Sequence, residues 1–491
     1  MRRGLLWFLA VSGGLGWMGL AVVLVWRRPI ASCALRHAFV GAGLEVKDLR
    51  VNAVGLHGAS AGPIDLSWHG QRVQVASLAI VRPNLISASL GRVTVKGLSV
   101  DVDLARLPEA NPAIPAAPAP GREWPRFDQV SVGGTVTLHV GNTGMPVQID
   151  FTARPDVTGR LIHAAAALSG ETFSAKGTLD YDLGRSAGRF ALQDSSIDLR
   201  RSRDLLDLIL PGVLTGWDVS GRIDLSGSGQ FGGGPMNGKL DLKLRDGAAS
   251  NPAKHLSVEG IEADVAVADL AKLTSRSGQR VRVASVRVGD VQLRNVDARF
   301  AIMGLHRIEL ESGSAEVFGG RVSAEPFAFD PLVVDYRPTF EVAGLQIAQA
   351  MALVPTATAR ATGVADGEVA VHYGPEGLSL GRGWLGLHAG SAGTLQLQEP
   401  GLLTANVSPD SMAYPTLKAV ETGLTNLRVN ALRVDIHPLN APPGRSVQIH
   451  VEGQPIDPTI KAPVTFDVNI NGPVEKLIQW GLDSRMNFSP K

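Results

Sequence analysis

Residues 313–331 read GSAEVFGGRVSAEPFAFDP, and two later segments, Gly367–Val371 (GEVAV) and Gly393–Leu397 (GTLQL), repeat one pattern. In both segments a glycine and a polar residue are followed by strictly alternating apolar and polar residues. An alternation with period two places one face of a strand in an apolar environment and the other face in water. The stretch from Gly313 to Leu397 therefore predicts β-strands that share an apolar face.

The same glycine unit recurs along the whole chain. Further copies open at Gly91, Gly134, Gly177, Gly221 and Gly238. Their irregular spacing argues against a propeller or a fixed-period solenoid and favours a meander of hairpins. At one strand per 8 to 12 residues, we expect roughly 35 strands. Helical patterns are few, and they cover 34–43, 201–210, 344–354, 414–427 and 473–482.

Composition excludes several classes of protein. The 491 residues include 56 glycines and 30 prolines without a collagen repeat, which is typical of many short strands and turns. The formal charge of +1 and the scattered basic residues do not favour a nucleic-acid partner. Cys33 is the only cysteine, so no intramolecular disulfide can form.

The N-terminus contains a long apolar segment. The 23 residues of Gly4–Trp26 carry no charge and are bracketed by Arg2-Arg3 and Arg27-Arg28. As a helix they would be about 34 Å long, which is enough to cross a hydrocarbon core of about 30 Å. A cleaved signal peptide usually has a shorter apolar region followed by a small-residue site. We therefore expect an uncleaved transmembrane anchor, with the rest of the chain translocated.

Five regions are expected. Residues 1–36 form the anchor, 37–107 a first β-rich region, 108–125 a proline-rich connector, 126–312 a central β-rich region and 313–491 a C-terminal β-rich region. The connector, PEANPAIPAAPAPGREWP, favours an extended conformation. The expected fold class is mainly β, an elongated, curled antiparallel sheet with a few short helices.

The sequence contains no recognisable catalytic constellation. Nucleophile-elbow, zinc-protease, Cys-x-x-Cys and phosphate-loop motifs are absent. The pairs Asp101/Asp103 and Asp180/Asp182 could hold a hard cation, but the first alternates with valines toward water and the second is expected to end a hairpin. We therefore expect no enzyme activity, no metal site and no cofactor.

The apolar face allows two interpretations. Its valines and leucines could pack against a second sheet as a sandwich core. Alternatively, one twisted sheet could curl into a trough whose apolar wall stays open and accepts acyl chains. The low aromatic content, 5%, is slightly better suited to the trough. The residues alone leave both interpretations open.

A family resemblance favours the trough. The segments Val317–Val322, Gly344–Ile347, Ala361–Gly367 and Gly377–Leu385, with the C-terminal run from Gly453 to Asn469, resemble the AsmA-like superfamily of bacterial envelope proteins, most closely its YdbH type. The resemblance covers about Gly313 to Asp483. It implies an inner-membrane-anchored periplasmic β-groove that carries phospholipids between the inner and outer membranes.

The resemblance and the alternation together give named expectations. Candidate groove residues are Val369, Val371, Leu378, Leu380, Leu395 and Leu397. Expected partners are phospholipid acyl chains, the inner membrane through residues 4–26, and a small envelope protein that adds a strand near Val464–Ile470. The helix at 344–354 could gate the trough. The alternative function is an envelope scaffold that assists assembly of outer-membrane proteins or surface material without carrying lipid.

Overall fold

The protein is described by a computed structural model. It describes residues 28–470 except for 30, 34, 38, 41–43, 56, 69–70, 84–88, 104–125, 141–142, 204–205, 207–213, 233–235, 332, 334, 353–358, 375–376, 398–403, 405–406, 439–446, 459 and 461. The chain divides into two compact units. Unit 1 is Met1–Val213 with Asp224–Lys239, and unit 2 is Leu214–Ile223 with Leu240–Lys491. The division falls within β10 (Asp218–Phe231) and at the start of β11 (Asn237–Asn251).

Unit 1 is a ladder of strands paired in chain order. Its strands are β1 (Glu45–Gly55), β2 (Gly58–Trp68), β3 (Gln71–Val81), β4 (Arg92–Asp103), β5 (Gln129–Val140), β6 (Thr143–Pro155), β7 (Leu161–Gly170), β8 (Phe173–Asp182) and β9 (Ala187–Asp198). All these pairs are antiparallel except β4 with β5, which is parallel. A parallel pair needs a long crossover connection. The proline-rich connector, residues 108–125, is placed in the chain to supply one, although it lies outside the described residues.

The first strands of unit 1 hold a small buried core. Leu49, Ile64 and Leu66 are almost fully buried, with Ala61 and Val75 beside them. Leu35 and Phe39, from helical residues between 28 and 40, pack against this core. A helix was expected here, at 34–43. None of the described helices is long and apolar enough to cross a bilayer, and the expected anchor, residues 4–26, lies outside the described residues.

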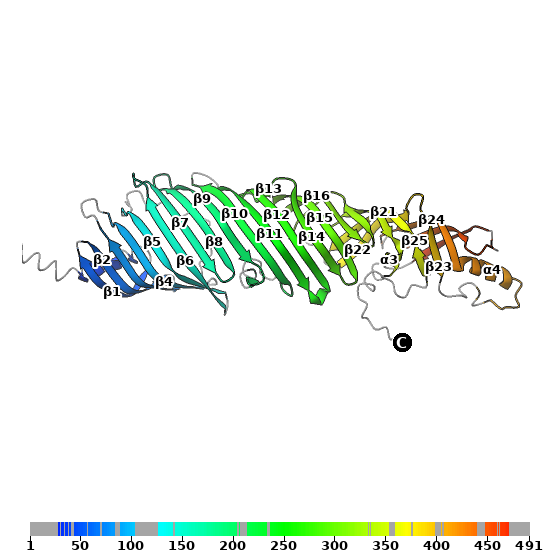
Figure 1. Ribbon diagram of the computed structural model, residues 1–491, viewed down its shortest axis with the longest axis horizontal. Helices are drawn as coiled ribbons and strands as arrows, with labels where there is room; N and C mark the ends of the chain where they lie inside the picture. The colour runs from blue at the N-terminus through cyan, green and yellow to red at the C-terminus, as the bar shows by residue number, and fades with distance from the viewer. Residues whose placement is uncertain are drawn as a thin grey trace, which may run out of the picture. The chain divides into compact units, whose positions relative to one another are not determined.

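Unit 2 is a second ladder of strands. From β11 it continues through β12 (Leu256–Asp269), β14 (Gln279–Val288), β15 (Val291–Gly304), β16 (Arg307–Val317), β17 (Gly320–Ala324), β19 (Thr339–Gln346), β21 (Val364–Gly374), β22 (Gly377–Leu387), β24 (Asn426–Ile436), β25 (Val447–Pro455) and β26 (Val464–Ile470). All these pairs are antiparallel, and Figure 1 shows β12, β14 and β15 side by side.

Short elements complete unit 2. They are the strands β13 (Thr274–Ser275), β18 (Phe327–Phe329), β20 (Ala359–Thr362) and β23 (Gly393–Leu397), the 3-10 helix η2 (Pro252–Lys254) and the helices α3 (Ile347–Met351) and α4 (Tyr414–Thr425). The expected helix at 414–427 is confirmed by α4 except for its last two residues, which begin strand β24. The helix expected at 344–354 is shorter, because residues 344–346 continue strand β19. The helix expected at 473–482 lies outside the described residues.

The strands are fewer and longer than expected. The described residues form 26 strands rather than roughly 35, and many have 10 to 15 residues. Gly393 opens β23 as expected and Gly91 directly precedes β4, but other glycines that were expected to open strands, among them Gly177 and Gly367, lie inside β8 and β21. At Gly177 and Gly367 the expectation was wrong, because a glycine inside a strand also allows close backbone approach. A Cβ on Gly367 would lie 2.1 Å from the carbonyl oxygen of Trp384 on the neighbouring strand.

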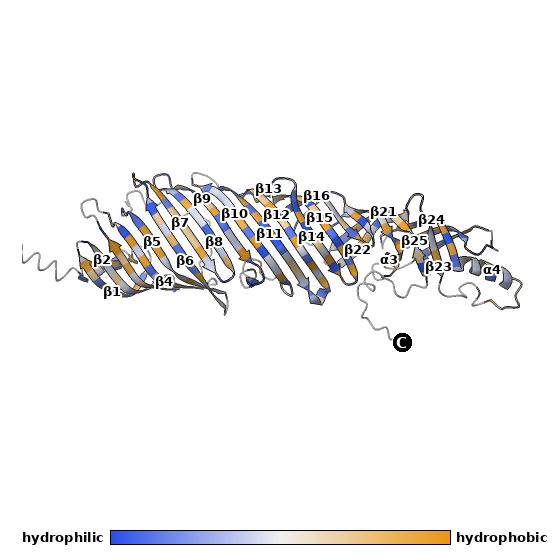
Figure 2. Ribbon diagram, in the orientation of Figure 1, coloured by the Kyte–Doolittle hydropathy of each residue, from blue (hydrophilic) through white to orange (hydrophobic). Residues whose placement is uncertain are grey.

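The strands alternate as expected, and Figure 2 shows hydrophobic and hydrophilic residues alternating along β12, β14 and β15. However, the alternation changes phase along these strands. On β12 the apolar positions are Leu256 and Val258, then Ile261 and Ala263, and Glu259 and Gly260 are both exposed between them. A shift of one residue would normally turn the later positions to the opposite face.

A row of kinks corrects the phase in neighbouring strands of unit 2. Val258 pairs with Val286 and Ile261 with Val283, so Gly260 lies opposite Ala284, and Ala284 in turn lies opposite Asn295 of β15. Gly260 has φ 65° and Asn295 has φ 51°, the left-handed region that suits glycine and asparagine. The aligned kinks keep the apolar residues on one face along the whole strand.

The last strand of unit 2 is held partly by a histidine. His450 of β25 contacts Asp467 of β26 through Nδ1 at 2.8 Å and Glu452 through Nε2 at 3.1 Å. Hydrogen bonding to Asp467, and then to Glu452, raises the pKa of His450. The residue paired with His450 on β24, Arg433, is bound to Asp435. Protonated His450 therefore links β26 to β25 through opposite charges.

We predict that Gly260→Ala destabilises unit 2 by about 1–3 kcal/mol. The added Cβ would lie 2.7 Å from the Cβ of Ala284, and the left-handed backbone would be strained. Gly278→Ala is the matched control, because Gly278 also has a positive φ, 77°, but has no atom within 4 Å of the added Cβ. Thermal unfolding followed by circular dichroism measures both variants. Equal destabilisation of the two would contradict the close packing at Gly260.

We predict that β26 is better protected at pH 6 than at pH 8.5. The raised folded-state pKa of His450 means that its stabilisation is fully present below the ordinary pKa, about 6.5, and is lost as pH rises through the folded-state pKa. Hydrogen exchange of 464–470, corrected for the intrinsic rate at each pH, measures this protection. His450→Gln should remove the pH difference, and an unchanged difference would show that His450 is not its source.

Candidate functional site

An apolar face crosses the central strands of unit 2. Residues directly opposite each other in an antiparallel pair lie on the same face. Val369 of β21 is opposite Phe340 of β19 and Gly383 of β22. Val371 is opposite Leu380. The register thus gathers apolar side chains of three strands on one side of the sheet.

The same face continues toward the last strand. Leu385 of β22 pairs with Val434 of β24, Val434 pairs with Ile449 of β25, and Ile449 pairs with Val468 of β26. Every member of this row is a large aliphatic residue. The face therefore runs across six strands, from β19 to β26, without a polar residue in these rows.

Much of the apolar face is half-exposed, although Val342, Ile436 and Val447 on the same face are buried. Val369, Val371, Leu380, Val434 and Ile449 are all partly accessible, and 40% of Val468 is exposed. In a sandwich a second sheet would bury such residues. The described strands of unit 2 contact their ladder neighbours in one sheet, and no second layer of described strands covers this face. For unit 2 the open-sheet interpretation is therefore confirmed over the sandwich.

One end of the face is covered by helix α4, which packs against β23, β24 and β25. Tyr414, Leu417 and Glu421 lie at helical spacing on its less exposed side. Beside the helix, Leu427, Val429 and Val451 form the buried cluster of unit 2, with Leu427 fully buried. Because this cluster is buried beside the helix, the apolar face is covered at this end.

Helix α4 carries a buried carboxylate. Only 4% of Glu421 is exposed. The hydroxyl of Thr404 donates to Glu421 Oε2 at 2.5 Å, and Lys418 Nζ lies 3.8 Å from Oε1. A buried charge needs such partners, since an unpaired one is strongly destabilising. Glu421 therefore ties the helix to the segment around Thr404.

The structure describes the side chains of four of the six predicted groove residues. Val369, Val371 and Leu380 lie on the shared apolar face of β21 and β22. Leu395 of β23 is half-exposed and pairs with Leu427 of β24 and Ala361 of β20. Leu378 and Leu397 belong to β22 and β23, but their side chains lie outside the described part of the chain.

The short helix α3 lies at the end of β19. The amide of Ile347 donates to the carbonyl of Gly363 at 3.0 Å. Just before the helix, the amide of Gly344 donates to Asp366 Oδ1 at 2.8 Å, and His388 Nδ1 contacts Asp366 Oδ2 at 2.6 Å. The Gly344 amide, and after it His388, lower the pKa of Asp366. This network fixes the chain where α3 begins.

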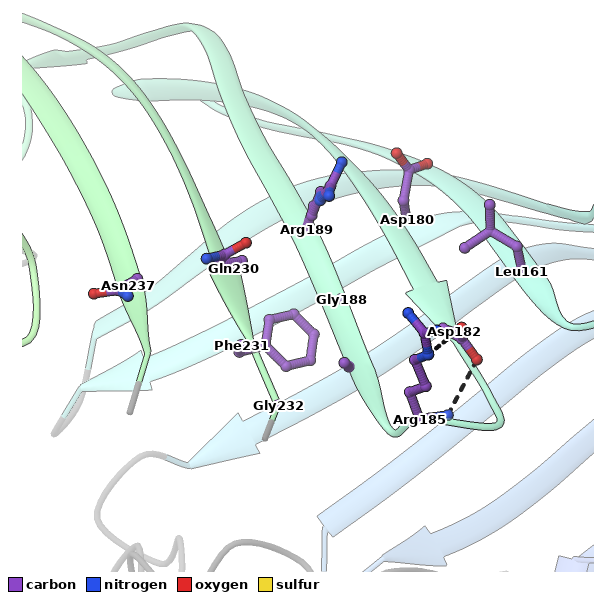
Figure 3. Close-up of a pocket in the computed structure, with 11 residues that line it drawn as sticks. Leu161, Asp180, Asp182, Arg185, Gly188, Arg189, Gln230, Phe231, Gly232 and Asn237 are labelled. Atoms are coloured by element: carbon purple, nitrogen blue, oxygen red, sulfur yellow. Dashed lines mark hydrogen bonds and ion pairs between the residues drawn. The ribbon is translucent and has the colours of Figure 1, made fainter. Parts of the chain in front are cut away.

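The carboxylates of the pair Asp180/Asp182 have structural partners. Asp180 Oδ1 contacts His163 Nδ1 at 2.6 Å, and Asp182 accepts the amides of Gly184 and Arg185 in the β8–β9 turn, which ends the hairpin as expected. Figure 3 shows the nearby depression of about 560 Å³, where the Phe231 ring lies against Gly188 and Arg185 lies beside Asp182. Within the described residues no group of three or more His, Cys, Asp or Glu could hold a metal ion.

Sequence reasoning missed an aromatic row in unit 2. The rings of Phe327 and Phe329 lie 5.6 Å apart, Phe329 meets Tyr336 edge-on at 5.4 Å, and Tyr336 stacks on Tyr373 at 6.3 Å. Tyr373 is on the same face of β21 as Val371, and 46% of it is exposed. Two of the four tyrosines of a chain poor in aromatics gather here. The Phe-x-Phe alternation at 327–329 was the available signal.

Comparison with known proteins gives one family match. No curated protein and no solved structure matches the chain. The model of the YdbH-like family, described as the intermembrane phospholipid transport protein YdbH, matches residues 209–478. This match covers just over half of the chain and begins about a hundred residues before the stretch that carries the resemblance in the sequence. The chain therefore belongs to the YdbH-like family.

Proposed function

We propose that this protein carries phospholipids between the inner and outer membranes along its apolar sheet face, without covalent chemistry. The observation that carries the proposal is the half-exposed aliphatic face from β19 to β26, which no second layer of described strands covers. A soluble protein rarely leaves a large contiguous apolar surface uncovered unless something binds there. The family membership supports a phospholipid as the ligand.

The chemistry of this face is suited to acyl chains. Removing a methylene group from water contributes about 0.8 kcal/mol, and this interaction has no preferred direction. The side chains of the row Leu385, Val434, Ile449 and Val468 offer no hydrogen bond that would fix an acyl chain in one place. An acyl chain on this face is thus held strongly against escape into water, but only weakly against sliding along the sheet.

The two helices of unit 2 have proposed roles at the borders of the face. Helix α4 closes the end near Leu427, so a lipid that leaves there must displace it or pass beside it. Helix α3 begins at the ends of β19 and β21 and acts as a gate at that edge. Both roles follow from position alone, since neither helix contributes a group that could react with a lipid.

The proposed location is the periplasm, with residues 4–26 as a single-pass anchor in the inner membrane. The anchor is supported by 23 uncharged residues between two pairs of arginines. The anchor would hold one end of the chain at the membrane from which lipids are taken, and the β-rich remainder would extend into the periplasm.

We also propose that a small envelope protein adds a strand to β26. This strand pairs with β25 over Val464–Ile470, and no described strand pairs with its other edge. An open edge offers unpaired backbone groups to another strand. The alternating apolar residues Val464, Phe466 and Val468 would let such a strand extend the apolar face.

We predict that Val369→Asp blocks lipid transfer while the protein still folds. The carboxylate would lie unpaired on the apolar face, where an acyl chain cannot solvate it. Transfer is measured as radiolabelled phospholipid that reaches the outer membrane in cells that depend on this protein. The matched control is Gln396→Asp, which adds the same charge at an exposed position of β23 opposite Arg360. Normal transfer by a folded Val369→Asp protein would contradict the proposal at this position.

We predict that a photo-crosslinking amino acid at Thr465 captures a small envelope protein, and that Val468→Pro abolishes the capture. Proline removes a backbone N–H and interrupts pairing of a strand. Crosslinking in intact cells followed by mass spectrometry identifies the adduct, and the same amino acid at exposed Gln454 of β25 is the control. If Thr465 captures no envelope protein, or if Val468→Pro leaves its adduct unchanged, strand addition at β26 is wrong.

A further inference from the structure

The ends of the strands in unit 2 form two edges of very different character. At the first edge, the loop 270–278 follows β12 and the turn 303–307 joins β15 to β16. At the opposite edge, η2 with His255 joins β11 to β12, and residues 289–290 join β14 to β15. Register places each set of turns together, because Leu256 pairs with Val288 at the opposite edge and Gln279 pairs with Phe300 near the first.

Exposed apolar side chains concentrate at the first edge. Leu273 is 41% exposed, Met303 49% and Leu305 57%, and Val333 and Tyr373 continue the series along the same edge. At the opposite edge, the turns 252–255 and 289–290 contain no large apolar residue. Two other exposed apolar residues of unit 2, Met412 before α4 and Ile456 after β25, lie farther along the chain. Exposed apolar residues grouped in this way indicate a binding surface.

The loop 270–278 and the turn 303–307, here called the tip cluster, are bound together. The Ile302 amide donates to Ser275 Oγ at 2.8 Å, and the Gly278 amide donates to a carboxylate oxygen of Glu311 at 2.9 Å. A Cβ on Gly304 would lie 3.9 Å from the carbonyl oxygen of Lys272. The two segments therefore present their side chains as one surface.

The tip cluster carries positive charge without an acidic residue of its own. It contains the cations Lys272, Arg276 and Arg307, and also His306. Of the neighbouring carboxylates, Glu309 binds Arg307 and Asp330 binds His306, whereas Asp269 and Glu311 accept backbone amides of the loop 270–278. Among the described residues Lys272 and Arg276 are exposed and make no ion pair with a carboxylate.

A phospholipid on the apolar face must keep its phosphate away from that face, because an unpaired charge on an apolar surface is costly. The phosphate must therefore lie at an edge of the sheet. The first edge offers cations beside exposed apolar side chains, and the tyrosines 336 and 373 farther along it are amphipathic residues that suit the border between acyl chain and head group.

We propose that the tip cluster is a head-group site, where Lys272 and Arg276 bind the phosphate of a phospholipid whose acyl chains lie on the apolar face of unit 2. Leu273 and Leu305 contact the part of the lipid next to the phosphate. This inference rests on the proposed function. It adds an orientation, because the head groups lie at the first edge and not at the opposite one.

The test is photo-crosslinking of the full chain in cells whose phospholipids carry ³²P in the phosphate and tritium in the glycerol. A benzophenone amino acid is placed at Leu305 in the tip cluster, at Val369 on the apolar face and at exposed Ala253 at the opposite edge. Mild alkali then cleaves the acyl esters. A bond to an acyl chain loses both labels, whereas a bond to the head-group side retains ³²P.

At Leu305 we expect an adduct that carries both labels before the alkali treatment and retains ³²P after it. At Val369 we expect an adduct that loses both labels in alkali. At Ala253 we expect no adduct that survives alkali. Lys272→Gln with Arg276→Gln should lower the Leu305 adduct about fivefold for each cation removed. The matched control is Lys254→Gln with Arg321→Gln, two exposed cations near the opposite edge, which should leave the yield unchanged. An unchanged Val369 adduct shows that each variant is folded.

The outcomes separate this inference from the function on which it rests. If Val369 gives an adduct but Leu305 gives only an alkali-labile adduct or none, the head-group site is wrong and lipid carriage stands. The same holds if Ala253 gives an alkali-stable adduct equal to that at Leu305. A ³²P adduct without tritium at Leu305 shows a free phosphate compound instead of a lipid and also overturns the site. The absence of any labelled adduct at Val369 overturns lipid carriage and, with it, the head-group site.

Discussion

The apolar face of unit 2 has no second layer of described strands over it, and the rest of the structure depends on that constraint. Most sheets bury such a face against helices or another sheet. Here Val369, Val371 and Leu380 are held in register by hydrogen bonds to neighbouring strands instead of by a packed core. Stability therefore comes largely from the ladder and from small buried clusters, and the face itself remains available to a ligand.

The borders of this face are specialised. Helix α4 packs at one end, where Leu427, Val429 and Val451 are buried, and Glu421 is satisfied by Thr404. In unit 1, Leu35 and Phe39 cover the first strands in a similar way. Away from the covered end of unit 2, one edge gathers exposed apolar residues beside Lys272 and Arg276. A covered end, an open face and a charged edge are what an amphipathic lipid would require of unit 2.

The alternation of residues predicted the strands of unit 2 and the shared face of Val369, Val371 and Leu380. It did not predict the row of kinks through Gly260, Ala284 and Asn295, because a phase change in one strand resembles an interrupted strand. The sequence does contain a sign of the kinks. In three strands, successive apolar residues are three positions apart instead of two, at Val258–Ile261, Val283–Val286 and Leu293–Val296. Only the register shows that these steps align.

The tip cluster could not be found from sequence, because Lys272 and Leu305 are brought together by pairing between separate hairpins. A lysine and a leucine in turns are ordinary residues until the strands between them are placed. The family, in contrast, was recognisable from segments such as Val317–Val322, because short motifs can be identified in the sequence without knowing which strands pair. Local patterns thus predicted the strands and the family. The grouping of residues at the edges of the sheet, and the alignment of the kinks, could be seen only in the folded structure.

The most direct test of the central idea is the phospholipid content of residues 37–491 released from cells without detergent, measured by native mass spectrometry. If the apolar face carries lipid, folded chains will retain phospholipid molecules, and replacing Val369 by aspartate will lower their number. Folded chains that are free of lipid in repeated preparations would contradict the central idea, and would favour a scaffold that assists assembly at the envelope.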